Sequence, residues 1–88
     1  MKIKNGFMLR NVAGNNVVVA VGKATMDFNG LITLNDSGTY IWSLLSEKDL
    51  SISELTDKVC EKYEIDRETA QNDVDEFVNK LKGAGIIE

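Results

Sequence analysis

The segment LITLNDSGTYIW, residues 31–42, contains the change from strand to helix that decides the fold. Its first four residues are apolar or β-branched, as in a short strand. Asn35 or Asp36 follows, and either side chain can accept a hydrogen bond from the first turn of a helix. The apolar side chains that come next recur at helical spacing: Ile41, Trp42, Leu44 and Leu45. The segment therefore predicts a short strand that leads directly into a capped helix.

The residues before this segment are rich in strand-forming side chains. The runs FMLRNV (7–12) and VVVAV (17–21) flank residues 13–16, where Gly14 and two asparagines tolerate positive φ. Residues 24–28 and 31–34 flank Asn29-Gly30, which is a strong hairpin signal. We therefore expect an antiparallel meander of three strands, with the middle strand bent at Gly22.

Two further helices are predicted after the first. Residues 46–50 resemble a turn, and Ser51 or Ser53 is expected to cap the second helix, since SISE (51–54) matches a capping box. Asp66 is expected to cap a third helix, which Gly83 and Gly85 end. Strands followed by helices predict a single α+β domain over residues 1–88, a small winged-helix-like unit with an N-terminal three-stranded antiparallel sheet and three helices.

The apolar pattern predicts one core. We expect its members to be Trp42, Leu45, Leu55, Val59, Val74, Phe77, Val78 and Leu81. Ile86 and Ile87 are expected to fold back onto it, and Gly38 to allow close packing against a strand. Phe77 is expected to serve the core first and to form a groove wall second. Cys60 is expected to be a small buried hydrophobe rather than a reactive thiol.

Composition excludes most kinds of catalytic site. The 88 residues include no histidine, which is the commonest general base and metal ligand. A single cysteine permits neither an intrachain disulfide nor a thiolate metal cage. There is also no phosphate-binding loop motif. We therefore expect no cofactor, no metal and no enzymatic activity.

The N-terminal residues lack the apolar run and cleavage site of a signal peptide. The longest apolar stretch, residues 17–21, is five residues long and too short to span a bilayer. A lone reduced cysteine fits the cytoplasm. These features predict a cytoplasmic protein with no membrane partner.

Charge is unevenly distributed along the chain. Residues 1–34 contain four basic side chains and one acidic side chain, whereas residues 35–88 contain six basic and 13 acidic ones. The net charges are therefore +3 and −7. A winged-helix DNA-binding or regulatory protein-interaction domain is the alternative that the fold allows. DNA binding requires a basic recognition helix, so the acidic helical half predicts no binding to nucleic acid.

Several motifs, taken in order, resemble those of the PqqD family. LNDSGTYIW (34–42) resembles its signature Leu-Asn-x-x-Gly-x-x-Ile-Trp, and SISEL (51–55) resembles its Thr-Val-x-Glu-Ile helix start. Residues 73–81 resemble its Asp-Val-x-x-Phe-Val-x-x-Leu third helix, and residues 85–87 its Gly-Leu-Ile end. The family includes coenzyme PQQ synthesis protein D and related precursor-peptide recognition elements.

The resemblance implies a non-catalytic peptide chaperone. Such domains capture the leader of a ribosomally made precursor peptide by strand addition, and they present it to a modifying enzyme, often a radical S-adenosylmethionine enzyme. The third strand carries no charge and no proline, so its edge suits this pairing. The residues expected to bind peptide are Leu31, Ile32, Thr33 and Leu34 on the strand and Asp75, Val78, Asn79 and Lys82 on the third helix. A homodimer is possible, because domains with strand edges can exchange elements between chains.

Overall fold

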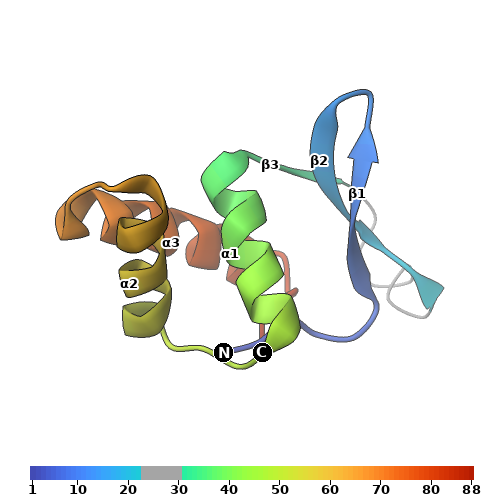
Figure 1. Ribbon diagram of the computed structural model, residues 1–88. Coiled ribbons are helices and arrows are strands. Elements are labelled where there is room, and N and C mark those ends of the chain that lie inside the picture. The colour runs from blue at the N-terminus through green and yellow to red at the C-terminus, as the bar shows by residue number, and fades with distance from the viewer. Residues whose placement is uncertain (23–30) are drawn as a thin grey trace.

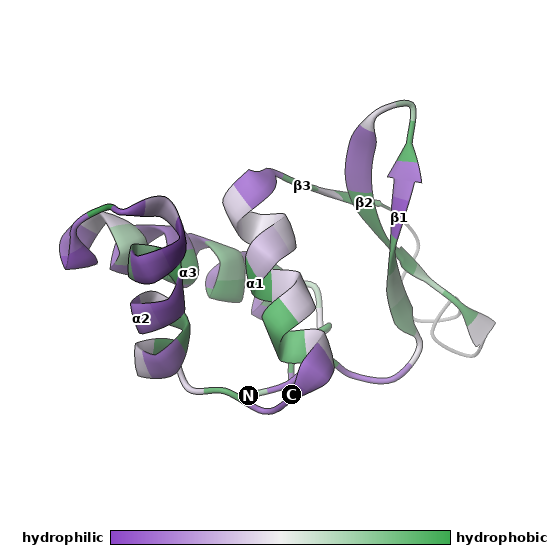
Figure 2. Ribbon diagram, viewed as in Figure 1, coloured by the Kyte–Doolittle hydropathy of each residue, from purple (hydrophilic) through white to green (hydrophobic). Residues whose placement is uncertain are grey.

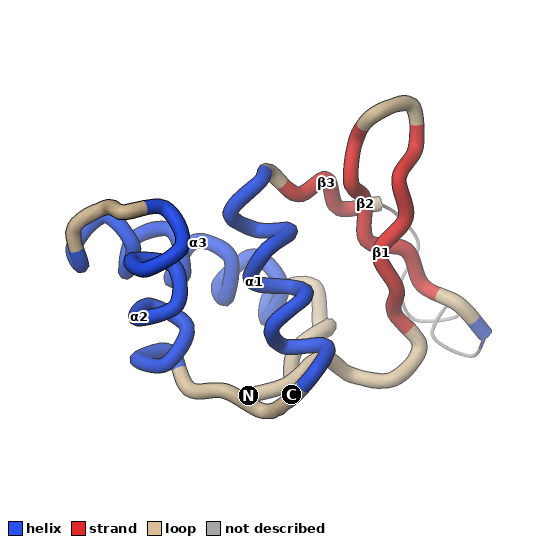
Figure 3. Tube along the Cα trace, in the orientation of Figure 1, coloured by secondary structure: helices blue, strands red, loops and turns tan. Residues whose placement is uncertain are grey.

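The computed structural model describes residues 1–22 and 31–88, and its elements follow the predicted order of strands and then helices (Figures 1 and 3). The strands are β1 (Phe7–Val12), β2 (Asn15–Ala20) and β3 (Ile32–Leu34). The helices are α1 (Asp36–Glu47), α2 (Ile52–Tyr63) and α3 (Arg67–Gly83). The α+β prediction is confirmed. The expected turn at Asn29-Gly30, with residues 24–28 before it, lies outside the described residues.

The sheet is an antiparallel meander in the order β1-β2-β3, as predicted. The β1–β2 turn consists of Ala13 and Gly14, whose φ angles of 52° and 84° lie in the left-handed region that suits two-residue hairpins. Val18 on the middle strand pairs with Leu9 on β1 and with Ile32 on β3. β2 ends at Ala20, so Gly22 lies beyond the strand and does not bend it.

The structure resolves which side chain caps each helix. Asn35, rather than Asp36, caps α1, since its side chain accepts a hydrogen bond from the Gly38 N–H at 2.8 Å. Ser51 caps α2 in a reciprocal capping box with Glu54. Asp66 caps α3 as expected. α1 continues to Glu47 and thus includes two residues of the predicted turn, because neither glycine nor proline interrupts it there.

One apolar core joins the sheet to the three helices. All eight predicted members belong to it, and further buried residues from every part of the chain join them: Val18, Leu34, Ile41, Leu50, Ala70, Ile86 and Ile87. The hydropathy colouring of Figure 2 shows that α2 is polar over most of its surface. This agrees with the burial of only Leu55, Thr56 and Val59 in that helix.

The chain ends lie side by side next to the core (Figure 1). Ile3 bridges Ile87, and the Lys4 N–H donates to the Ile86 carbonyl at 2.8 Å. Ile86 and Ile87 are fully or almost fully buried, which confirms that they fold back onto the core. In the described part of the chain, no helix has both the length and the apolar character needed to cross a membrane.

Gly38 lies in the first turn of α1, close to the end of β3. A Cβ built at this position would lie 3.5 Å from the Leu34 Cβ and 3.0 Å from the Asn35 Oδ1. The contact with Leu34 is of ordinary van der Waals length, whereas the contact with Asn35 is tight. The crowding at Gly38 is therefore against the N-cap side chain rather than against the strand that the sequence predicted.

Candidate functional site

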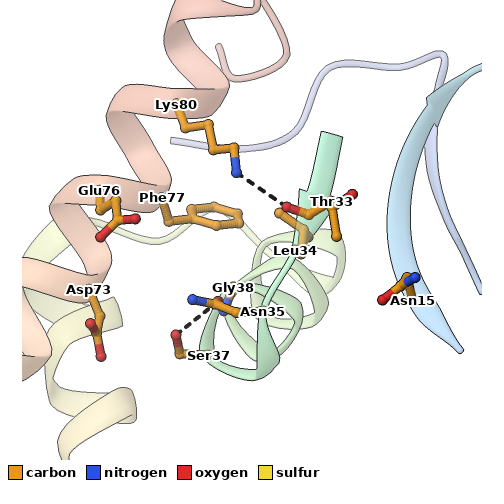
Figure 4. A pocket seen from close by; sticks show the side chains of 10 residues that line it. All are labelled: Asn15, Thr33, Leu34, Asn35, Ser37, Gly38, Asp73, Glu76, Phe77 and Lys80. Atoms are coloured by element: carbon orange, nitrogen blue, oxygen red, sulfur yellow. Dashed lines mark hydrogen bonds between the residues drawn. The ribbon is translucent and has the colours of Figure 1, made fainter. Parts of the chain in front are cut away.

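β3 is one of the two edge strands of the sheet within residues 1–22 and 31–88, and β1 is the other. β3 pairs with β2 on one side, whereas its other side faces α3. The carbonyl oxygen of Thr33 accepts a hydrogen bond from the Nζ of Lys80 on α3, at 3.2 Å (Figure 4). This carbonyl is thus directed toward the helix.

The direction of the Thr33 carbonyl establishes which backbone groups face outward. In an antiparallel strand, the N–H and C=O of one residue point to the same side, and successive residues alternate. The Thr33 N–H therefore also faces α3, whereas the backbone groups of Ile32 and Leu34 face β2. Thr33 offers one donor and one acceptor to anything that enters from the side of α3.

A cavity of about 370 Å³ lies between β3 and α3. The residues that line it are Asn15, Thr33, Leu34, Asn35, Ser37, Gly38, Asp73, Glu76, Phe77 and Lys80. Its volume is at the lower end of the roughly 300–1,000 Å³ typical of ligand clefts, so it suits a few side chains of a larger partner. We call this cavity, together with the outer edge of β3, the β3–α3 groove.

One face of α3 forms a wall of the groove. Asp73, Glu76, Phe77 and Lys80 recur at spacings of three, one and three residues, which places them together on a helix. The Phe77 ring extends toward Leu34 (Figure 4), and both side chains are also buried members of the core. Phe77 therefore serves core and groove wall together, and it offers an apolar contact between the polar groups.

The charges of the groove are separated along its length. Lys80 lies at the end beside Thr33, whereas Asp73 lies toward Ser37 at the start of α1 (Figure 4). Burial raises the pKa of the nearby Tyr63, and the charge of Asp36, the neighbouring Tyr40 and the charge of Asp73 raise it further. Two carboxylates, from α1 and α3, thus act on the same phenol. The groove is basic at one end and acidic at the other.

Of the strand residues predicted to bind peptide, Thr33 and Leu34 line the groove directly. The half-buried Ile32 begins β3, and Leu31, with 65% of its surface exposed, precedes the strand. Leu31 is a large apolar side chain in solvent beside an open strand edge, so it offers a further apolar contact.

The predicted residues on α3 occupy a different part of the helix. Asp75, Val78, Asn79 and Lys82 are not among the groove-lining residues. Each of them comes two positions after one of the groove-lining residues of α3. Two positions correspond to a rotation of about 200° around the helix axis. Val78 is only 3% exposed and belongs to the core. These four residues stay a prediction as peptide contacts, whereas the groove itself brings Asp73, Glu76 and Lys80 to β3.

The sequence contained one signal for the groove-facing side, which was Phe77. If an aromatic side chain in a helix borders a groove, the residues four and one positions before it and three positions after it lie near the same side of the helix. For Phe77 these residues are Asp73, Glu76 and Lys80. Asp73 and Glu76 appeared in the sequence as an ordinary solvated face. The position of β3 beside them, which periodicity alone does not give, distinguishes the two sides of α3.

A second cavity lies between the N-terminal segment and the end of α1, lined by residues 2–7 and 45–49. The N-terminal ammonium of Met1 forms an ion pair with the carboxylate of Asp49, which lines this cavity. Cys60 is partly buried against the core. In residues 1–22 and 31–88, no three of the Cys, Asp and Glu side chains form a group that could hold a metal ion.

Comparison with known proteins connects this groove with peptide recognition. Among solved structures, the chain is similar to TbiB1 in complex with the TbiA(beta) leader peptide, with a TM-score of 0.75 and 26% sequence identity. That match covers 100% of this chain and 95% of the TbiB1 chain. No curated protein matches the chain. Residues 16–87, well over half of the sequence, match the family described as Coenzyme PQQ synthesis protein D (PqqD). The chain therefore belongs to the PqqD family.

Proposed function

We propose that this protein captures the leader of a ribosomally made precursor peptide in the β3–α3 groove and presents it to a modifying enzyme. The observation that carries the proposal is the outward-facing backbone of Thr33, which lies at a strand edge and lines the same cavity as the apolar side chain of Phe77. Membership of the PqqD family supports it. So does the likeness to TbiB1, whose structure contains a leader peptide.

Strand addition is the binding mode that these groups favour. An extended peptide can donate a backbone N–H to the Thr33 carbonyl and accept the Thr33 N–H, and this extends the sheet by one strand. Alternate side chains of the peptide would then face α3, where Phe77 and Leu34 give apolar contact and the charged residues give selectivity. The contacts predicted from the sequence, Asp75, Val78, Asn79 and Lys82, stay part of the proposal, although they lie about 200° around α3 from the residues that line the groove.

The proposal assigns binding rather than catalysis to the groove. The lining residues supply one strand edge, apolar contacts and side chains of both charges, which together position a peptide. The covalent chemistry is assigned to the partner, which we propose to be a radical S-adenosylmethionine enzyme or another peptide-modifying enzyme. We also propose a cytoplasmic location. A homodimer formed through β3 would occupy the same edge and compete with the peptide.

Two substitutions at one position test strand addition. Proline at Thr33 removes the outward N–H but leaves the pairing of β3 with β2, because Ile32 and Leu34 make that pairing. Thr33→Val keeps the N–H and removes only the hydroxyl. The probe is the leader segment of a candidate precursor peptide, and a scrambled leader serves as the control peptide. We expect Thr33→Pro to weaken binding at least tenfold and Thr33→Val to change it little. Equal affinity of the two variants would contradict strand addition.

A further inference from the structure

Lys80 occupies the acceptor that a bound peptide would use. Its side chain is long and solvent-exposed, so its ammonium could remain fully hydrated, yet Nζ donates to the Thr33 carbonyl at 3.2 Å. Lysine is one of the side chains that protect open strand edges from unwanted pairing. In the free protein, Lys80 thus covers the outward acceptor of β3.

We propose that Lys80 is a displaceable cap on the β3 edge and that, once displaced, it selects peptides with an acidic side chain beside Thr33. This inference rests on the proposed function, since it concerns the peptide that enters the same groove. The peptide backbone N–H replaces the ammonium at the Thr33 carbonyl. The released ammonium remains next to the strand and forms an ion pair with a carboxylate of the peptide.

The acidic end of the groove extends this selectivity to a second peptide position. Glu76 precedes Lys80 by four residues, which is about 6 Å along a helix axis. In an extended peptide, two residues that share a face lie two positions apart, or about 6.6 Å. A peptide with its acidic side chain at Lys80 therefore places the side chain two residues along beside Glu76. Asp73 lies one further turn along the same face.

The preferred peptide is thus an extended segment with an acidic side chain and, two residues from it, a basic side chain. The reverse charge order would place like charges together at both ends, which disfavours binding. The arrangement therefore defines both the charge pattern of the peptide and its direction along the groove.

A selection from a displayed library of random twelve-residue peptides tests the inference without a known ligand. The baits are the wild-type protein, Lys80→Glu, Lys80→Met and the matched control Lys58→Glu. The control makes the same charge change on the exposed surface of α2. Wild type and Lys58→Glu are expected to enrich the acid-x-base pattern, and Lys80→Glu is expected to lose the acidic preference. Thermal melts confirm that each bait is folded.

Binding of two individual peptides then distinguishes two roles of Lys80, a displaceable cap on the Thr33 carbonyl and a simple charge contact with the peptide. One carries the enriched pattern, and the other has its acidic residue replaced by the neutral amide. Lys80→Met frees the Thr33 carbonyl and removes the ion pair. It should therefore bind the amide peptide more tightly than wild type does, and bind the acidic peptide about fivefold more weakly. Weaker binding of both peptides would overturn the displaceable cap.

The outcomes also separate this inference from the proposed function. Peptides that are enriched without any charge pattern, and that still fail to bind Thr33→Pro, would overturn the role of Lys80 and leave strand addition intact. Enrichment of the same charge pattern by wild type and by Lys80→Glu would also overturn the role of Lys80. Failure of every bait to enrich any peptide over the bare support would contradict the proposed function and, with it, this inference.

Discussion

The Gly38 N–H donates to the Asn35 Oδ1 over 2.8 Å, and a Cβ at Gly38 would lie only 3.0 Å from that same oxygen. The cap of α1 thus depends on a hydrogen bond that leaves little room for a side chain at position 38. Asn35 cannot easily move away, since its Oδ1 also accepts from the Ser37 hydroxyl at 3.1 Å. The start of α1, directly after β3, is therefore tightly constrained.

Gly38→Ala tests this junction against Gly83→Ala. Alanine in a helix is favoured over glycine by about 1 kcal/mol, and at Gly83 no neighbouring atom lies within 4 Å of the new Cβ. We expect Gly83→Ala to raise the free energy of unfolding and Gly38→Ala to lower it, because the new Cβ weakens the Asn35 cap. Urea unfolding followed by circular dichroism measures both. A gain in stability at both positions would contradict the account of the junction.

Trp42 tests the core. Its side chain is 5% exposed and belongs to the single apolar cluster. Trp42→Ala should lower the free energy of unfolding by about 3–5 kcal/mol, since it removes a large buried ring and leaves a cavity. That is a large share of the stability of so small a domain. A melting temperature within a few degrees of the parent would show that Trp42 contributes little to the core.

Asp66 links the stability of α3 to pH. Hydrogen bonds from Thr69 hold the pKa of the Asp66 carboxyl below its ordinary value of 3.8. The folded state therefore favours the carboxylate, and the stabilisation is present above that value and is lost as the pH falls through the lowered pKa. Asp66→Asn keeps an acceptor at the cap but does not titrate.

The difference in unfolding free energy between wild type and Asp66→Asn reports this effect. We expect this difference to be constant between about pH 7 and pH 5. Below about pH 4, wild type should lose stability relative to Asp66→Asn, because the Asp66 carboxylate becomes protonated. Urea titrations at several pH values supply the measurement. A difference that does not change down to about pH 2 would mean that the Thr69 hydrogen bonds do not couple to ionisation.

Charge reversal on α3 identifies which side of the helix meets the peptide. Lys80 lines the β3–α3 groove, whereas Lys82 lies about 200° around the helix. We expect Lys80→Glu to alter the affinity for the cognate leader several-fold more than Lys82→Glu does, as measured by calorimetry. A larger effect at Lys82 would instead favour the contact set that the sequence alone predicted.

Much of the fold follows from local patterns in the sequence. The helices were predictable because each begins at a residue with a capping side chain, and because apolar spacing identifies the faces that form the core. Two capping residues were possible for α1, Asn35 or Asp36, and two for α2, Ser51 or Ser53. The geometry of the first helical turn determines which of the two caps each helix. Sequence spacing does not contain that information.

The groove was only half predictable for a related reason. The strand edge at residues 31–34 is visible in the sequence as a short uncharged run before a cap. The choice of side on α3 depends on tertiary packing, which buries Val78 and turns Lys80 toward Thr33. Both sides of this helix carry polar residues, so composition does not distinguish them.

The central claim is that a leader peptide adds to β3 opposite α3, and amide chemical-shift mapping tests it most directly. Isotope-labelled protein is titrated with the leader peptide that binds the wild-type protein. The account predicts that the largest shifts fall on residues 31–35 and on Asp73, Glu76, Phe77 and Lys80, and that the Thr33 amide becomes protected from exchange. Saturating peptide that shifts amides elsewhere and leaves Thr33 in rapid exchange would contradict it.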